Sequence, residues 1–212
     1  CLVMVTPDAE RTMLTYLGVS DSISTLEMDF EAALNSTYIY LEGYLVTSDA
    51  ARSAIIEMKD FAKSKGVKTA MTFSDPSMLE YFKADVNRVI GEGVDLLFCN
   101  RQEALLWSGA KDLSGAIEAL KRIAGQFAVT TGSEGSILWD GGQLTQIAPV
   151  EVPVIDTNGA GDMYAGAFLY GITNGMSFAE AGALASKASA AVVTQYGPRL
   201  AVEAHNALLG SF

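Results

Sequence analysis

Short apolar runs alternate with stretches of helical periodicity through the first two thirds of the chain. The predicted strands cover residues 37–41, 67–73, 94–99 and 127–131, and the predicted helices cover 48–65, 78–92 and 115–124. Strands that alternate with helices require right-handed crossovers, which produce a mostly parallel sheet with helices on both faces. The pattern therefore predicts an α/β fold.

Both ends of the chain depart from this alternation. Two apolar runs around a polar turn predict a β-hairpin in each of two places, in residues 1–17 and 135–148. The second hairpin is expected at an edge of the sheet. After it the pattern predicts only helices, over residues 160–173 and 177–194, which are rich in Ala, Gly and Ser and can pack closely. No repeat or linker divides the chain, so one domain is the simplest interpretation.

Composition narrows the class of protein. Half of the 212 residues are apolar, which is enough for a large core without disulfides, and the two cysteines, Cys1 and Cys99, have no zinc-site spacing. The net charge of -11 disfavours nucleic acid and anionic membranes as partners. No apolar run of roughly 20 residues predicts a membrane span, and no signal peptide is recognisable, so we expect a cytoplasmic protein. The chain begins within a predicted strand, and we expect N-terminal sequence to be missing.

The strongest candidate for chemistry is the run Asp156-Thr157-Asn158-Gly159-Ala160-Gly161-Asp162. It stands directly before a predicted helix, so its backbone N–H groups and the positive end of the helix dipole point at one spot. Glycine lets a phosphate approach the backbone closely. The run therefore predicts an anion-binding site.

Asp162 has two interpretations. A carboxylate in the first turn of a helix can be no more than a dipole-stabilising cap. Beside an anion site, the same carboxylate is placed to accept a proton from a hydroxyl that attacks phosphorus. We take Asp162 as the candidate catalytic base.

The run resembles the C-terminal signature of the ribokinase, or PfkB, family of carbohydrate and nucleoside kinases, and the likeness extends over nearly the whole chain. It implies a ribokinase-like three-layer α/β/α fold, with residues 1–17 as the remnant of a β lid and 18–212 as the catalytic domain. It also implies ATP- and Mg²⁺-dependent phosphorylation of a hydroxymethyl group on a small sugar or nucleoside. Gly159, Ala160 and Gly161 would then form the anion hole.

The resemblance also assigns residues to the nucleotide. Asn100 is expected near the phosphates and Glu103 is expected to organise Mg²⁺ through water, although a helix cap at Asn100 is the alternative. Ser186 is expected near the adenine. A strand and turn are expected to hold ATP, and they comprise Thr130, Thr131, Gly132, Ser133, Glu134 and Gly135. Without the resemblance, this segment would indicate only the corner of a hairpin. Gly161 and Asp162 are expected to complete the nucleotide site.

Two further assignments come from the resemblance. Arg11 is similar to an arginine that some relatives swing toward the transferring phosphate, and a solvated hairpin charge is the alternative. Oxygen-only coordination suits a hard cation, and a K⁺ site beside the anion hole is implied for the Asp156 carboxylate and for carbonyls at or near Asn158, Val192, Gln195 and Gly197.

The chain departs from the family by lacking the N-terminal portion that carries a Gly-Gly element, most sugar contacts and much of the lid. A fragment of this kind could bind nucleotide without turnover, so a non-catalytic nucleotide-binding module is the alternative function. The choice between sugar and nucleoside, and a homodimer through the lid of the intact protein, stay open. A dinucleotide-binding oxidoreductase is disfavoured, because no Gly-x-Gly-x-x-Gly follows the first strand.

Overall fold

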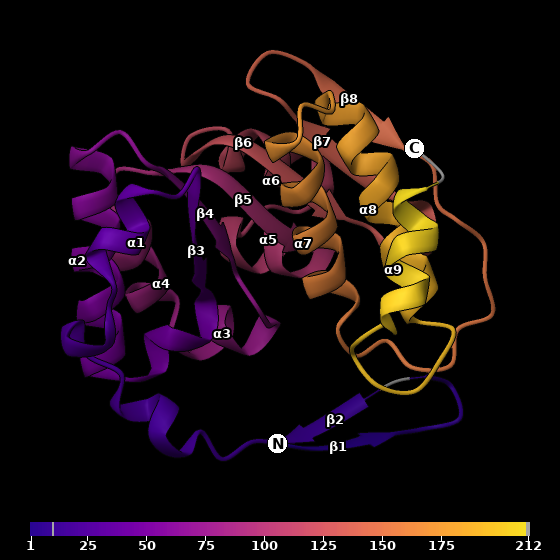
Figure 1. Cartoon of the computed structure of the whole chain (residues 1–212), viewed down its shortest axis with the longest axis horizontal. Helices are drawn as coiled ribbons and strands as arrows, with labels where there is room; N and C mark the ends of the chain where they lie inside the picture. Colours follow the sequence, from indigo (N-terminus) through magenta and orange to yellow (C-terminus); the bar gives the residue numbers. More distant parts are fainter. Residues whose placement is uncertain (10, 211–212) are drawn as a thin grey trace. The chain divides into compact units, whose positions relative to one another are not determined.

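The computed structural model describes residues 1–9 and 11–210. Six strands hydrogen bond side by side in the order β3-β4-β5-β6-β7-β8, and two further strands form a separate antiparallel pair (Figure 1). Contacts divide the chain into two compact units. Unit 1 comprises Cys1–Tyr16, Thr130–Leu138 and Gln143–Phe212, and unit 2 comprises Leu17–Val129 and Trp139–Gly142. The domain boundary expected between residues 17 and 18 stays a prediction.

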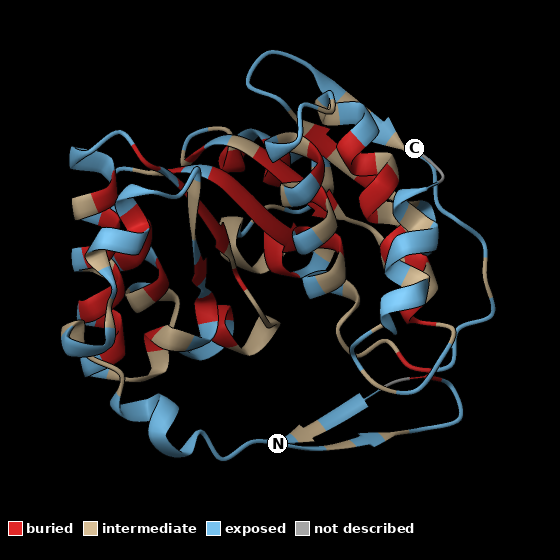
Figure 2. Ribbon diagram, in the orientation of Figure 1, coloured by how far each residue is buried: buried red, intermediate tan, exposed pale blue. Residues whose placement is uncertain are grey.

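Unit 2 is built on parallel strands. β3 (Tyr38–Glu42) pairs with β4 (Lys68–Thr72), and β4 pairs with β5 (Val94–Asn100), both in parallel. β6 (Ala124–Thr130) follows in the sheet order. The side chains of β4 and β5 are mostly buried, as expected for strands covered on both faces (Figure 2). The predicted α/β class and mainly parallel sheet are confirmed.

The helices of unit 2 follow the predicted alternation with differences at their ends. They are α1 (Phe30–Leu34), α2 (Asp49–Ser64), α3 (Pro76–Tyr81), α4 (Lys83–Ile90), α5 (Arg101–Ser108) and α6 (Leu113–Leu120), with 3₁₀ turns η1 (Gly18–Ser22), η2 (Thr25–Glu27) and η3 (Gly43–Thr47). The helical stretch predicted over 78–92 contains two helices, α3 and α4, which are separated because Phe82 leaves the helical conformation. The helix predicted to reach residue 124 stops at Leu120, because the Ile123 carbonyl accepts a hydrogen bond from the N–H of Val94 at the start of β5.

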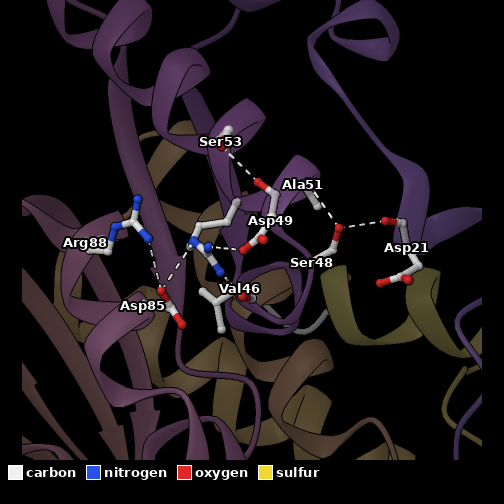
Figure 3. A network of polar contacts seen from close by, with 9 residues as sticks. Asp21, Val46, Ser48, Asp49, Ala51, Ser53, Asp85 and Arg88 are labelled. Atoms are coloured by element: carbon white, nitrogen blue, oxygen red, sulfur yellow. Dashed lines mark hydrogen bonds and ion pairs between the residues drawn. The ribbon is translucent and has the colours of Figure 1, made fainter.

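A buried arginine, Arg52, joins three elements of unit 2, and Figure 3 labels its partners Val46, Asp49 and Asp85. Arg52 of α2 is 9% exposed, and its Nη1 donates to the Val46 carbonyl of η3 at 2.9 Å. Its guanidinium also pairs with Asp49 on the same helix and with Asp85 of α4, where Nε and Oδ1 are 3.4 Å apart. Removing one partner of such a network would leave an uncompensated buried charge, so the network fixes how α2, α4 and η3 pack.

Unit 1 contains the other elements. β1 (Leu2–Val5) and β2 (Arg11–Leu14) form the predicted N-terminal hairpin, with Leu2 opposite Leu14. The second predicted hairpin corresponds to β7 (Ser136–Trp139) and β8 (Leu144–Ile147), and the helices are α7 (Ala160–Thr173), α8 (Phe178–Val192) and α9 (Val202–Leu209). Figure 1 shows these helices in orange to yellow.

Small residues let α7 and α8 approach closely, as their composition predicted. A Cβ added to Gly171 of α7 would lie 2.8 Å from the Cβ of Ala181 on α8, so only glycine permits this spacing. The rings of Phe168 and Phe178 meet edge to face nearby, with centroids 4.7 Å apart. Among the residues described, no helix has the length and apolar character needed to cross a membrane.

Candidate active site

The signature run forms a tight turn before α7. Gly159 stands at the N-cap position with φ +75°, and a Cβ there would lie 2.6 Å from the Cβ of Pro198. Both the positive φ and the proline contact exclude a side chain. The Gly159 carbonyl accepts the first helical hydrogen bond from Met163 at 2.9 Å, so the helix starts where the sequence predicted.

The N-terminus of α7 is left without a side-chain cap. The N–H groups of Gly161 and Asp162 have no acceptor among the described residues, as is usual for the first turn of a helix with no cap. A Cβ added to Gly161 would meet nothing within 4 Å, so the space over this turn is open. Asp162 lies in this turn and is exposed. Unpaired N–H groups at an open helix start are the arrangement that favours an anion, and the anion-binding role of this turn stays a prediction.

Asp156 holds the turn in place. It is 3% exposed, and its two carboxylate oxygens accept the N–H groups of Asn158 at 2.8 Å and Gly197 at 2.9 Å. Three members of the predicted K⁺ set are thereby brought together. Val192 is the buried last residue of α8, and the Gln195 amide donates to the Arg199 carbonyl at 2.8 Å. The K⁺ assignment itself stays a prediction.

A cavity of about 450 Å³ lies in unit 1 and includes the helix start. Its volume is within the range of small-molecule sites. Valine, proline and alanine supply its apolar wall, and the rest of its lining comes from residues with hydroxyl groups, from glycines and from Glu151. Predicted nucleotide residues from distant parts of the chain line it together, namely Thr130, Gly132, Ser133, Gly135, Gly161 and Ser186. Thr131, Glu134 and Asp162 are not among the lining residues. Thr131 instead closes the turn by donating to the Gly135 carbonyl through its N–H and its hydroxyl, each at 2.9 Å.

The structure adds Tyr164 to the site. It lies one turn into α7, lines the cavity and is 3% exposed, and its hydroxyl is 2.7 Å from that of Ser136. Burial raises the pKa of Tyr164 to about 12, against smaller opposite effects of hydrogen bonds with Ser136 and Ser186. In the sequence Tyr164 looks like an ordinary apolar position of a helix, and no local signal identifies its hydroxyl partners.

Tyr164 predicts a specific alkaline destabilisation. The unfolded phenol ionises near its ordinary pKa of 10 whereas the folded one ionises near 12, so the stability that this group contributes is complete below pH 10 and lost as the pH rises to 12. The free energy of unfolding of the native sequence, relative to that of Tyr164→Phe, should fall by about 1 kcal/mol between pH 9 and pH 11. Urea unfolding of both proteins at the two pH values measures this difference, and a constant difference would refute it.

The N-terminal hairpin contributes Arg11 to the same unit. Its Nη1 donates to the hydroxyl of Thr157 at 2.9 Å, and that hydroxyl donates to the Ala9 carbonyl at 3.2 Å. The hairpin end therefore contacts the signature turn, although the two are more than 140 residues apart in the sequence. The role of Arg11 toward a phosphate stays a prediction.

Asn100 and Glu103 belong to unit 2 and form a reciprocal cap of α5. The Asn100 side chain accepts the Glu103 N–H at 2.8 Å, and the Glu103 carboxylate accepts the Asn100 N–H at 2.9 Å. The helix cap that the sequence allowed is thus present, and Glu103 is 4% exposed. Within the described part of the chain, no group of three or more His, Cys, Asp or Glu residues could hold a metal ion. A single carboxylate such as that of Glu103 suits Mg²⁺ only where water and phosphates supply most of the ligands.

Comparison with known proteins agrees with this geometry. The family model "pfkB family carbohydrate kinase" matches residues 1–205. A protein named "Uncharacterized sugar kinase" from Archaeoglobus fulgidus is 26% identical over 93% of this chain and 77% of its own length. An adenosine kinase from Schizophyllum commune is 25% identical over 94% of this chain and 63% of its own.

Solved structures give the same result. The adenosine kinase from Sinorhizobium meliloti superposes with a TM-score of 0.93 at 36% identity, and the match covers 99% of this chain and 65% of that one. A probable sugar kinase from Rhizobium etli gives the same TM-score at 31% identity, covering 99% of this chain and 64% of that one. The chain thus spans slightly less than two thirds of the length of these structures. With the signature turn, the cavity and the family match in agreement, the chain belongs to the pfkB family of carbohydrate kinases.

Proposed function

We propose that this chain carries the nucleotide site and catalytic base of an ATP-dependent kinase that phosphorylates a hydroxymethyl group on a small sugar or nucleoside. The observation that carries this proposal is the uncapped start of α7, which lines the cavity and bears Asp162 in its first turn. An uncapped helix start favours an anion, and a neighbouring carboxylate favours proton transfer from a hydroxyl. Family membership supports the same reaction class.

The residues present fit ATP. The apolar wall of the cavity suits a base, with Ser186 beside it, and the turn at Gly132 and Gly135 leaves backbone close to the ligand. The open space over Gly161 suits a phosphate, because nothing within 4 Å would meet even a Cβ there. ATP supplies the phosphoryl group to be transferred. In this proposal Gly159, Ala160 and Gly161 hold its charge, and Asp162 accepts the proton of the acceptor hydroxyl.

The cation assignments are part of the same proposal. In this proposal Asn100 lies near the phosphates and Glu103 orients Mg²⁺ through water. K⁺ is held beside the signature turn by the Asp156 carboxylate and by carbonyls at or near Asn158, Val192, Gln195 and Gly197. Replacing K⁺ by choline in the assay tests the K⁺ site separately.

An acceptor panel tests the function. Relatives are named for adenosine, cytidine, ribose and fructoselysine, so these four compounds and fructose are offered with Mg-ATP, and ADP formation is measured against a blank without acceptor. We expect one chemical class to raise ADP formation above the blank, with a phosphorylated product detected by mass spectrometry. The thermal midpoint with and without Mg-ATP is recorded alongside.

The outcomes separate the two functions. If Mg-ATP raises the thermal midpoint and no acceptor yields a product, the result favours the non-catalytic nucleotide-binding module. If Mg-ATP neither binds nor is consumed, both functions are refuted.

A further inference from the structure

One side chain connects the N-terminal hairpin to the signature turn. The Thr157 hydroxyl accepts a hydrogen bond from Arg11 at 2.9 Å and donates one to the Ala9 carbonyl at 3.2 Å. Because a hydroxyl has one donor and two acceptor positions, Thr157 satisfies both contacts at once. No aliphatic side chain of the same shape could replace it in this role.

The hairpin end is specifically arranged around this contact. Ala9 has φ +64°, which is uncommon for a residue with a Cβ, and it is only 5% exposed. Its N–H donates to the Thr6 carbonyl at 2.9 Å, so the turn points the Ala9 carbonyl at Thr157. An uncommon conformation persists where its surroundings hold it, and the Thr157 bond is such a restraint.

The charge of Arg11 lies near the positive N-terminal end of α7. Thr157 lines the same cavity as Gly161 and stands three positions before the first residue of α7. Cations are normally favoured at the C-terminus of a helix and disfavoured at its N-terminus. A guanidinium held at this end therefore places two positive features together, an arrangement that a polyphosphate would stabilise.

We propose that Thr157 is a positioning residue, which holds the Arg11 guanidinium beside the N-terminus of α7 so that the hairpin supplies a positive charge to the outer phosphates of bound ATP. This inference rests on the proposed nucleotide site. The role that it assigns to Thr157 comes from the contact with Arg11, not from the position of Thr157 in the cavity or in the signature.

The test compares ATP with AMP, which has the same base and ribose and lacks the outer phosphates. Binding of each is measured by calorimetry for the native sequence, Thr157→Val and Thr157→Ser. We expect Thr157→Val to lower the affinity for ATP about tenfold, as for the loss of one hydrogen bond to a charged group. The affinity for AMP should change less than about twofold. Thr157→Ser keeps the hydroxyl and should bind ATP like the native sequence.

Two controls isolate the mechanism. Thr173→Val makes the same substitution at the other end of α7, where the hydroxyl bonds only carbonyls of its own helix, and should change neither affinity. Arg11→Met should lower the affinity for ATP by a similar factor. Adding Thr157→Val to it should have little further effect, because both substitutions remove the same contact between Arg11 and Thr157.

The opposing results are equally specific. Equal weakening of ATP and AMP by Thr157→Val, failure of serine to restore binding, or additive effects with Arg11→Met would each overturn the positioning role while leaving the nucleotide site intact. A native protein that binds no ATP would refute the proposed function together with the charge role of Arg11. Amide hydrogen exchange of residues 2–9 measures the stability of the hairpin contact without nucleotide. The exchange should be faster in Thr157→Val than in Thr157→Ser.

Discussion

Replacing Asp162 by Asn is expected to lower kcat for the acceptor found by the panel by about a hundredfold or more. The amide keeps the size of the side chain but cannot take the proton of the attacking hydroxyl. ATP should bind as tightly as before or slightly more tightly, because a negative charge is removed from beside the phosphates. Steady-state kinetics and calorimetry on one preparation measure both quantities.

The matched control is Asp112→Asn. Asp112 caps α6 through a bond from Gly115 at 2.8 Å, and Asn caps a helix about as well as Asp, so kcat should not change. The competing interpretation of Asp162 is a cap that stabilises the helix dipole. It predicts a small loss of stability and a kcat within about tenfold of the native value, and that result would exclude Asp162 as the base.

Replacing Gly161 by Ala is expected to change stability and ATP affinity in opposite directions. The added Cβ meets nothing within 4 Å, and alanine is the better helix former, so the free energy of unfolding should rise, by up to about 1 kcal/mol. The same methyl group occupies the space through which a phosphate must approach the backbone N–H groups. ATP affinity should therefore fall by about a hundredfold, equivalent to about 3 kcal/mol.

Gly166→Ala provides a control on the same helix. Gly166 also has nothing within 4 Å of an added Cβ, but it does not line the cavity. It should gain similar stability and keep native ATP affinity. Thermal unfolding and calorimetry of both variants give the comparison, and an unchanged ATP affinity in Gly161→Ala would place the phosphates elsewhere.

Much of the fold was predictable because it depends on local patterns. The alternation of apolar runs identified β3, β4 and β5 and the long helix α2 to within about two residues at each end. Errors occurred where distant backbone decides an element's end, as at Ile123, whose carbonyl is taken by Val94. α9 was not predicted as a helix, and α5 was indicated only by the possible helix cap at Asn100, since each is eight residues long and has a weak apolar periodicity.

The candidate chemistry of the signature could also be predicted from its local sequence. Glycines and an aspartate at the start of a helix act through that helix's own N–H groups, so Gly159–Gly161 and Asp162 needed only their immediate sequence to be singled out. The same locality explains why a helix cap at Asn100 was foreseen as an alternative, whereas the reciprocal bond from Glu103 was shown by the structure.

Only the tertiary structure decided how this turn is held and what surrounds it. The contacts of Gly159 with Pro198, of Asp156 with Gly197, of Tyr164 with Ser136 and of Thr157 with Arg11 join residues from 28 to 146 positions apart. Such pairs depend on chain topology, and single hydroxyls or prolines carry no periodic signal that would pair them in a sequence. The sequence by itself thus determined the α/β class and the glycine-rich helix start proposed to bind an anion, because these follow from short-range geometry, whereas long-range packing selected the residues that position them.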